Sequence, residues 1–238
     1  MEKYKWKKGS HIEVILSFSI FILLLSLLYL ILKPAALLKE KEEITKLIEN
    51  VIIDQVSSEI TITPIKIINV EDNMGCSILN DLFLSGRYSN KIIARDDGGV
   101  VFEIKKVGNN LEIRNSHKNF FRIYSSNEFQ DILENNAGDE GCQQKNYETG
   151  VKRVEKMVSE KKIYSLKERY ENDYAALKTE IGLEKQRDFG FEFFFMNNTN
   201  ISTNFGNFKG SVFVKRIPIL YFTNNASIEA GVLVIRVW

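Results

Sequence analysis

The stretch "VILSFSIFILLLSLLYLIL", residues 14–32, contains nineteen consecutive residues without a charge. As an α-helix rising about 1.5 Å per residue it would be about 28 Å long, close to the thickness of the hydrocarbon core of a bilayer. A cleavable secretory signal has a shorter apolar run, about 7–15 residues, and a small-residue cleavage site after it. Here Lys33 and Pro34 follow instead. The stretch therefore predicts a transmembrane helix over residues 10–33, rather than a removable signal or a buried core helix.

Lysines flank the predicted helix on both sides. Four of them crowd the first eight residues, and four more are spread over residues 33–46. Basic residues close to a span favour the cytoplasmic side, and a long domain after the span is translocated largely regardless of its charge. We therefore expect a single-pass protein of the cell membrane, in contact with membrane lipid, with a cytoplasmic N-terminus and an extracytoplasmic head.

Residues 34–58 have the pattern of an amphipathic helix or stalk. Apolar residues recur at helical spacing with Lys and Glu between them: Leu37, Ile44, Leu47, Ile48, Val51, Ile52 and Val56. Pro34 at its start would kink a continuous rod or begin a second helix. The apolar stripe must be covered, either by the domain that follows or by a neighbouring chain.

Residues 59–238 predict an α+β head, with a mainly antiparallel sheet and one or two helices packed on it. Strand patterns occur at residues 59–70, 90–95, 100–107, 110–116, 119–126, 188–195, 211–222 and 230–238. Pro64 indicates that the first of these is an edge strand or carries a bulge. The last is apolar on both faces, which favours a position inside the sheet. Phenylalanine alternates strictly over 188–195, which predicts one strongly apolar face.

The remaining segments of the head predict turns and helices. "DDGG" (96–99) and "GNN" (108–110) are hairpin turns. A helix is expected over residues 165–182, because Ser165 and Glu168 match a capping box and Gly182 suits a helix end. Residues 151–162 predict another helix or an extension of this one. Residues 125–150 are polar and are expected to be mostly loop, with room for a short helix.

Two cysteines, Cys76 and Cys142, lie in the predicted head. In an extracytoplasmic head a disulfide between them is the simplest interpretation, and two unpaired thiols are the alternative. N-x-S/T sequons at Asn197, Asn200 and Asn225 are possible glycosylation sites. In a chain this rich in asparagine, however, about two sequons are expected by chance, so they say little about location.

The search for a catalytic or ligand site finds no convincing motif. The net charge is only +1, from 32 basic and 31 acidic residues, which argues against nucleic-acid binding through bulk charge. No Cys/His cluster, phosphate loop, dinucleotide fingerprint or hydrolase motif is present. Asp96 and Asp97 are better explained as turn residues than as metal ligands. We therefore expect a protein that is not an enzyme and has no cofactor, metal or nucleic-acid partner.

The N-terminus resembles that of type IV pilin-like proteins, particularly the archaeal ones with a class III signal peptide. The resemblance covers residues 1–57 and rests on a basic leader ending in Gly9, a polar patch with Glu13, and the apolar run. It implies that a prepilin-type peptidase cleaves between Gly9 and Ser10. It also implies that Glu13 neutralises the free N-terminal amine of an adjacent subunit. Glu13 is fourth after Gly9, whereas the family's glutamate is usually fifth.

Two functions are consistent with these observations. The first is a pilin-like or pseudopilin-like structural subunit of a type IV pilus or secretion-type assembly at the cell surface. Its N-terminal helix would pack with other subunits or with assembly machinery. The alternative is a signal-anchored extracytoplasmic binding or sensory module that forms no filament. In that case Glu13, with His11 beside it, would be solvated at the edge of the membrane. A charged side chain next to a transmembrane segment carries an energetic cost there.

Overall fold

The computed structural model describes residues 11–68, 75–83, 89–114, 118–135, 141–183, 187–204 and 212–238, and for residues 11, 12, 34–41 and 135 the backbone alone. The predicted leader and both residues of the predicted cleavage site, Gly9 and Ser10, lie outside this part of the chain. The protein divides into two compact units, Met1–Leu47 and Ile48–Trp238. Each unit is described by itself.

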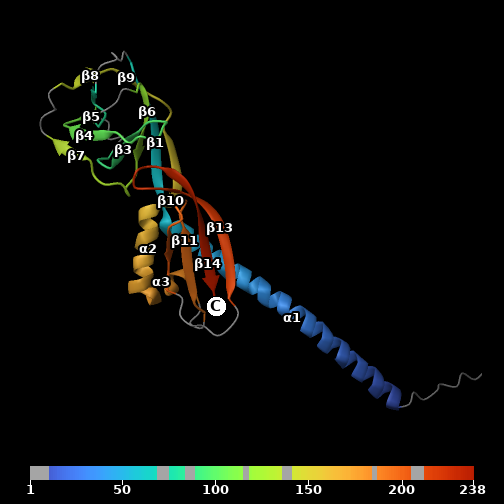
Figure 1. Cartoon of the computed structure of the whole chain (residues 1–238). Coiled ribbons are helices and arrows are strands. Elements are labelled where there is room, and N and C mark those ends of the chain that lie inside the picture. The colour runs from blue at the N-terminus through green and yellow to red at the C-terminus, as the bar shows by residue number, and fades with distance from the viewer. Residues whose placement is uncertain are drawn as a thin grey trace, which may run out of the picture. The chain divides into compact units, whose positions relative to one another are not determined.

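Three helices and fourteen strands form from the described residues (Figure 1). The helices are α1 (His11–Val56), α2 (Glu160–Asn172) and α3 (Tyr174–Ile181). The strands of the first part of the head are β1 (Ser57–Ile67), β2 (Cys76–Leu79), β3 (Ile92–Arg95), β4 (Glu103–Val107), β5 (Asn110–Arg114), β6 (Phe120–Ser125), β7 (Leu133–Asn135), β8 (Gln143–Lys145) and β9 (Tyr147–Thr149). Those of the second part are β10 (Arg153–Ser159), β11 (Phe189–Phe194), β12 (Asn200–Ser202), β13 (Phe213–Phe222) and β14 (Ile228–Val237).

Helix α1 joins the predicted transmembrane and amphipathic segments into one helix of 46 residues. No second helix begins at Pro34. A proline removes one backbone hydrogen bond from a helix, and cooperative helix formation on both sides keeps the remaining ladder intact. The chain passes from α1 directly into β1 at Ser57, whose hydroxyl donates to the carbonyl of Ile53 in the last turn.

The head is α+β, as predicted, and contains two sheets. The larger has the strand order β12-β11-β14-β13-β10-β1-β6-β3, and β9 also pairs with β1. The smaller has the order β7-β4-β5-β2-β8. Most pairs are antiparallel, and the pairs β10–β13, β2–β8 and β4–β7 are parallel. As predicted, the apolar segment at the C-terminus lies inside the sheet, because β14 runs between β11 and β13.

Strand β1 buries opposite faces in its two halves. Ile60 and Ile62 of the first half belong to a core with Tyr124, Phe129 and Phe222. Ile65, in the second half, belongs to a different core. Because successive side chains of a strand point to opposite faces, Ile62 and Ile65 lie on opposite sides of the sheet. One long strand therefore contributes to two cores.

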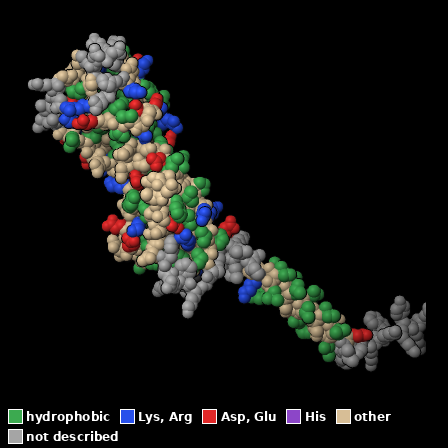
Figure 2. All heavy atoms as spheres, viewed as in Figure 1, with side chains coloured by type: hydrophobic (Ala, Val, Ile, Leu, Met, Phe, Trp, Pro, Cys, Tyr) green, Lys and Arg blue, Asp and Glu red, His purple; other side chains and the backbone are tan. Residues whose placement is uncertain are grey.

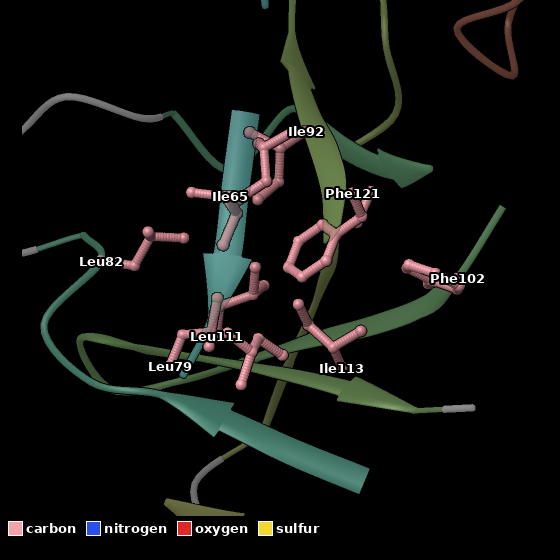
Figure 3. Packing of buried hydrophobic residues seen from close by; sticks show 11 residues of the cluster. Ile65, Leu79, Leu82, Ile92, Phe102, Leu111, Ile113 and Phe121 are labelled. Carbon is pink, nitrogen blue, oxygen red and sulfur yellow. The ribbon is translucent and has the colours of Figure 1, made fainter. Parts of the chain in front are cut away.

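The second core lies between the β1–β6–β3 end of the large sheet and the small sheet (Figure 3). Leu79, Leu111 and Ile113 of the small sheet are fully buried there. The rings of Phe102 and Phe121 meet edge to face, with centroids 5.6 Å apart. This part of the head is thus a sandwich of two sheets, with the apolar side chains of both packed between them.

Of the two predictions from Pro64, the edge strand is wrong, because β1 pairs with β6 on one side and with β9 and β10 on the other. The bulge is confirmed in the pairing of β1: between the pairs Ile62–Arg153 and Ile65–Thr149, two residues of β1 face three residues of the partner segment. The carbonyl of Pro64 accepts a hydrogen bond from Gly150 N at 2.8 Å. In an antiparallel strand the N and the C=O of a residue point to the same side, so the proline nitrogen also faces the junction of β9 and β10. The ladder of backbone hydrogen bonds is interrupted at this junction, so the absence of an N–H group on Pro64 costs little stability.

The four alternating phenylalanines of the β11 segment are buried, as predicted, with exposures of 0–6%: Phe189, Phe191, Phe193 and Phe195. Helix α2 covers them through Tyr170, whose ring meets Phe189 and Phe191 edge to face at 5.6 and 5.8 Å. Its buried hydroxyl donates to the carbonyl of Phe189 at 2.7 Å. The alternation therefore forms an aromatic core under the helices.

The helix boundaries predicted between residues 151 and 182 are partly wrong. Residues 153–159 form strand β10, because pairing with β1 overrides local helix propensity. Ser165 does not cap a helix: it lies inside α2, and its hydroxyl donates to Lys161 O at 3.2 Å. Asp173 separates α2 from α3 and caps α3 by accepting from Ala176 N. Gly182, with φ +77°, ends α3 as predicted.

The region from residue 125 to residue 150 contains strands β7, β8 and β9, and its described residues form no helix. These strands have three residues each, too few for their own pattern to identify them.

The "DDGG" turn is confirmed. The Asp96 carboxylate accepts from Val100 N at 2.8 Å, and Gly99 has φ +90°. Asp96 is thus a turn residue, as predicted.

Candidate functional site

The N-terminal part of α1 is long and apolar enough to cross a membrane. It extends from Glu13 to Lys33 with a mean hydropathy of 2.8. All of its large apolar side chains are exposed, between 44 and 68%, and Figure 2 shows them covering the visible face of the helix. The hydroxyls of Ser19 and Ser26 donate to the carbonyls of Ile15 and Ile22. These polar groups are therefore satisfied within the helix, as the bilayer interior requires.

Polar and aromatic side chains mark both ends of this segment. Glu13 lies exposed in the first turn of α1, where a carboxylate interacts favourably with the helix dipole. The ammonium of Lys33 lies 5.7 Å from the centre of the Tyr29 ring. A tyrosine and a lysine are typical of the interface between lipid and water. For His11, the structure describes the backbone alone.

The last turns of α1 belong to the head. Ile48, Ile52 and Val56 recur every fourth residue and are 0–3% exposed, so this part of the predicted apolar stripe is packed. Leu47, which the prediction placed in the same stripe, is 45% exposed. Glu49 pairs with Lys215 of β13, and Asp54 pairs with Lys156 of β10. The hydrogen bond from Lys156 lowers the pKa of the Asp54 carboxyl.

Cys76 and Cys142 form the predicted disulfide, with Cα atoms 4.7 Å apart. The bond joins the first residue of β2 to the residue that precedes β8, so it connects two neighbouring strands of the small sheet. Beside it lies Glu112 of β5, which is only 1% exposed and whose carboxylate is 3.3 Å from Arg114 Nε. Glu112 alternates with apolar Leu111 and Ile113, a pattern typical of a solvated position, yet its side chain is buried because strands from distant parts of the chain surround it.

A cleft of about 510 Å³ lies beside β3, an edge strand of the large sheet. Ile92 and Ile132 contribute apolar walls, and Asp131, Lys161 and Asn224 contribute polar groups. Large apolar side chains are exposed close by in the chain, namely Val100 (59%), Val101 (44%) and Leu133 (70%). Of these three, Val101 lines the cleft, whose surface is therefore partly apolar and partly polar.

The hydrogen bonding of β3 shows which backbone groups face this cleft. Ser126 N donates to Lys91 O, on the side of β6. Because the pattern alternates along an antiparallel strand, the peptide groups of Ile92 and Ala94 point away from β6. The carbonyl of Ala94 accepts from Phe102 N at 2.9 Å, the carbonyl of Asn90 accepts from Ile132 N at 2.8 Å, and Arg95 forms an antiparallel bridge with Val101. Segments of the head itself therefore already lie against this side of β3 before and after Ile92.

Two of the three sequons border a second, more polar cleft of about 390 Å³. Asn197 and Asn225 line it together with Arg95, Glu229 and Tyr221. Burial raises the pKa of the Tyr221 hydroxyl to about 12, and its hydrogen bond to Glu229 acts in the same direction. The Tyr221 hydroxyl in this cleft therefore stays protonated over the physiological pH range.

The third sequon, Asn200, lies at the start of edge strand β12, where its side-chain amide donates to Glu192. All three asparagines are exposed.

No family model matches the chain, and no curated protein or solved structure shows significant similarity to it. A proposal for the function therefore has to rest on the N-terminal apolar helix, the small sheet with its disulfide, and the cleft beside β3.

Proposed function

We propose that the chain is a pilin-like or pseudopilin-like structural subunit, anchored by the N-terminal part of α1 and displaying its β-rich head outside the cell. The observation that carries this proposal is the segment Glu13–Lys33. It is long enough to span a bilayer, every large apolar side chain in it is exposed, and a carboxylate stands in its first turn.

The chemistry of the segment explains why it would assemble. Helices in lipid associate through van der Waals packing and through polar groups that find partners. A carboxylate at the rim of a span is costly and is stabilised by a neighbouring positive charge. The free amine created by cleavage before Ser10 would provide such a charge on an adjacent subunit. A head outside the cell would also keep its disulfide and would present Asn197, Asn200 and Asn225 for glycosylation.

The second candidate function is a signal-anchored binding module, and the cleft beside β3 favours it. An apolar segment of a partner could enter this cleft beside Ile92 and cover the exposed side chain of Val101 and that of its neighbour Val100. This function requires neither cleavage nor a carboxylate at position 13.

The position of the mature N-terminus distinguishes the two functions. For a pilin-like subunit, N-terminal sequencing of protein from cells with active prepilin-type peptidase is expected to begin at Ser10. The variant Gly9→Val should retain Met1, because the resemblance places a glycine directly before the cleaved bond. Retention of Met1–Gly9 in the unmodified protein would refute the processing step and favour the binding module.

Replacing Glu13 with Gln is expected to reduce the co-purification of tagged and untagged subunits at least about tenfold. The loss of one charge pair at low effective dielectric weakens the association of subunits by more than about 1.4 kcal/mol, which is the free energy of a tenfold change in affinity. Glu42→Gln is the matched control, because Glu42 is an exposed glutamate of the same helix beyond the apolar segment. Equal co-purification of the Glu13 and Glu42 variants would contradict the role of Glu13, and the measurement is a pull-down in mild detergent.

A further inference from the structure

We propose that, with the head outside the cell as proposed above, the fold selects one of the three N-x-S/T sequons, that of Asn197, as the acceptor of an N-linked glycan. All three acceptor asparagines are exposed, so their own exposure does not separate them. The middle residue of each sequon does. Asn198 is exposed, whereas Ile201 and Ala226 are only 5% and 1% exposed. A transferase has to hold the acceptor and its neighbours in a defined geometry, and a buried middle residue obstructs this.

Two of the sequons occupy the same position in two hairpin turns of the same form. In the turn 195–199, which joins β11 to β12, the first N–H donates to the last carbonyl at 2.9 Å and the fourth N–H to the first carbonyl at 3.2 Å. The turn 223–227, which joins β13 to β14, has the same two bonds, at 2.9 and 3.0 Å. The fourth residue has a positive φ in both, +62° at Asn198 and +56° at Ala226. The acceptor is the third residue of each turn, so the backbone of the turn does not select between them.

The surroundings of these two turns differ. The carbonyl of Ala226 accepts from Arg95 Nη1 at 3.1 Å, and Ala226 belongs to the buried core that contains Phe129 and Phe222. The sequon of the turn 223–227 would therefore have to leave this core before an enzyme could bind it. In the turn 195–199, by contrast, every residue after the first is exposed, and Met196 is 69% exposed.

The third sequon, which begins at Asn200, is part of strand β12. Its middle residue, Ile201, pairs with Phe193 of β11. The side-chain nitrogen of Asn200, the atom that would form the new bond, already donates to Glu192 at 2.9 Å. Modification of this sequon would therefore require the edge strand to detach and the hydrogen bond to Glu192 to break.

The side chain of Asn197 is held with its nitrogen available. Asn197 Oδ1 accepts from Thr199 N at 3.0 Å and from Thr199 Oγ1 at 2.6 Å. Because a backbone N–H can only donate, the oxygen must face it, and Nδ2 points away from the turn. Among the described residues, Nδ2 of Asn197 has no hydrogen-bond partner. The threonine that the sequon requires thus orients the acceptor in the folded protein.

The reaction needs one co-substrate, an oligosaccharide linked through phosphate or diphosphate to a polyprenol. Nδ2 of Asn197 attacks the anomeric carbon and forms a C–N bond. The C–O bond to the phosphate breaks, and its electron pair leaves with the phosphate oxygen, while Nδ2 gives one proton to a base of the transferase. Asn197 lines the polar cleft that contains Tyr221 and Glu229, so this bulky hydrophilic group would cover part of that cleft.

The test is glycosylation of the purified, folded chain in mild detergent. The reagents are a single-subunit oligosaccharyltransferase that recognises N-x-S/T and a polyprenyl-diphosphate oligosaccharide, and fragmentation mass spectrometry locates the glycan. For each sequon the rate is divided by the rate of the same sequon in the unfolded, reduced chain. This ratio is expected to be at least about tenfold higher for Asn197 than for Asn200 and Asn225, which react only after local opening. A ratio for Asn197 that does not exceed the other two would refute the proposal.

Two variants in equivalent positions complete the experiment. Thr199→Val is expected to abolish the glycan at Asn197, and Thr199→Ser should retain it. Ser227→Ala is the matched control in the other turn and should leave the total amount of glycan on the folded chain unchanged. A clear fall in that amount would show that Asn225 is an acceptor and would contradict the proposal. Because the chain is purified, the result does not depend on the side of the membrane that the head occupies, which protease treatment of intact cells tests separately.

Discussion

Replacing both Cys76 and Cys142 with serine is expected to lower the free energy of unfolding of the head by about 4 kcal/mol. The disulfide closes a loop of 66 residues, and on the chain-entropy model a loop of this length restricts the unfolded chain by about that amount. The loop contains β2 to β7, so the loss should fall on the sandwich of the two sheets. Urea unfolding of the full chain in mild detergent, followed by circular dichroism, measures it.

Reduction of the unmodified protein provides the control for this experiment. The reduced protein keeps both cysteines, so any effect of the serine hydroxyls on the sheet is absent. It is expected to unfold at the same urea concentration as the double variant. If the oxidised protein and the double variant have the same midpoint, the disulfide contributes no stability.

Replacing Phe193 with Ala is expected to destabilise the head by about 3–5 kcal/mol, the range for removing a buried aromatic ring. Phe193 is 1% exposed, and its ring lies 4.7 Å from the centre of Phe195 and 5.5 Å from that of Tyr221. It also lies against Gly231 of β14, where an added Cβ would come within 2.7 Å of the ring. Packing this close leaves a cavity when the ring is removed.

Phe194 is the matched control, because it is the next residue of β11, points to the other face and is 38% exposed. Phe194→Ala is expected to cost about 1 kcal/mol or less, as is usual for substitutions near the surface. The comparison uses the same urea unfolding measurement. Equal losses for the two variants would show that the alternation along β11 does not define the buried face.

Local pattern was sufficient where a segment is long or its alternation strict. The apolar run from residue 14 to residue 32 has no polar interruption except three serines and a tyrosine, so it predicts a membrane-compatible helix whatever follows. The alternating phenylalanines of β11 likewise identify their buried face. With two cysteines in the chain, only one intramolecular pair was possible.

Local pattern failed where pairing partners outweigh propensity. Residues 153–159 look helical, and they form a strand because β1 supplies a complete ladder of hydrogen bonds beside them. Pro64 looks like an edge residue, and it is tolerated inside the sheet because β9 gives way to β10 at that point. Three-residue strands such as β7, β8 and β9 have too few positions to show a period.

The candidate sites divide in the same way. The apolar helix and the position of Glu13 in its first turn follow from composition and spacing within one segment, and the cysteine pair follows from there being only two cysteines. The burial of Glu112 beside the disulfide and the cleft beside β3 depend on segments far apart in the chain. Their contacts arise from sheet order and register, which long-range packing sets and no short stretch of sequence encodes.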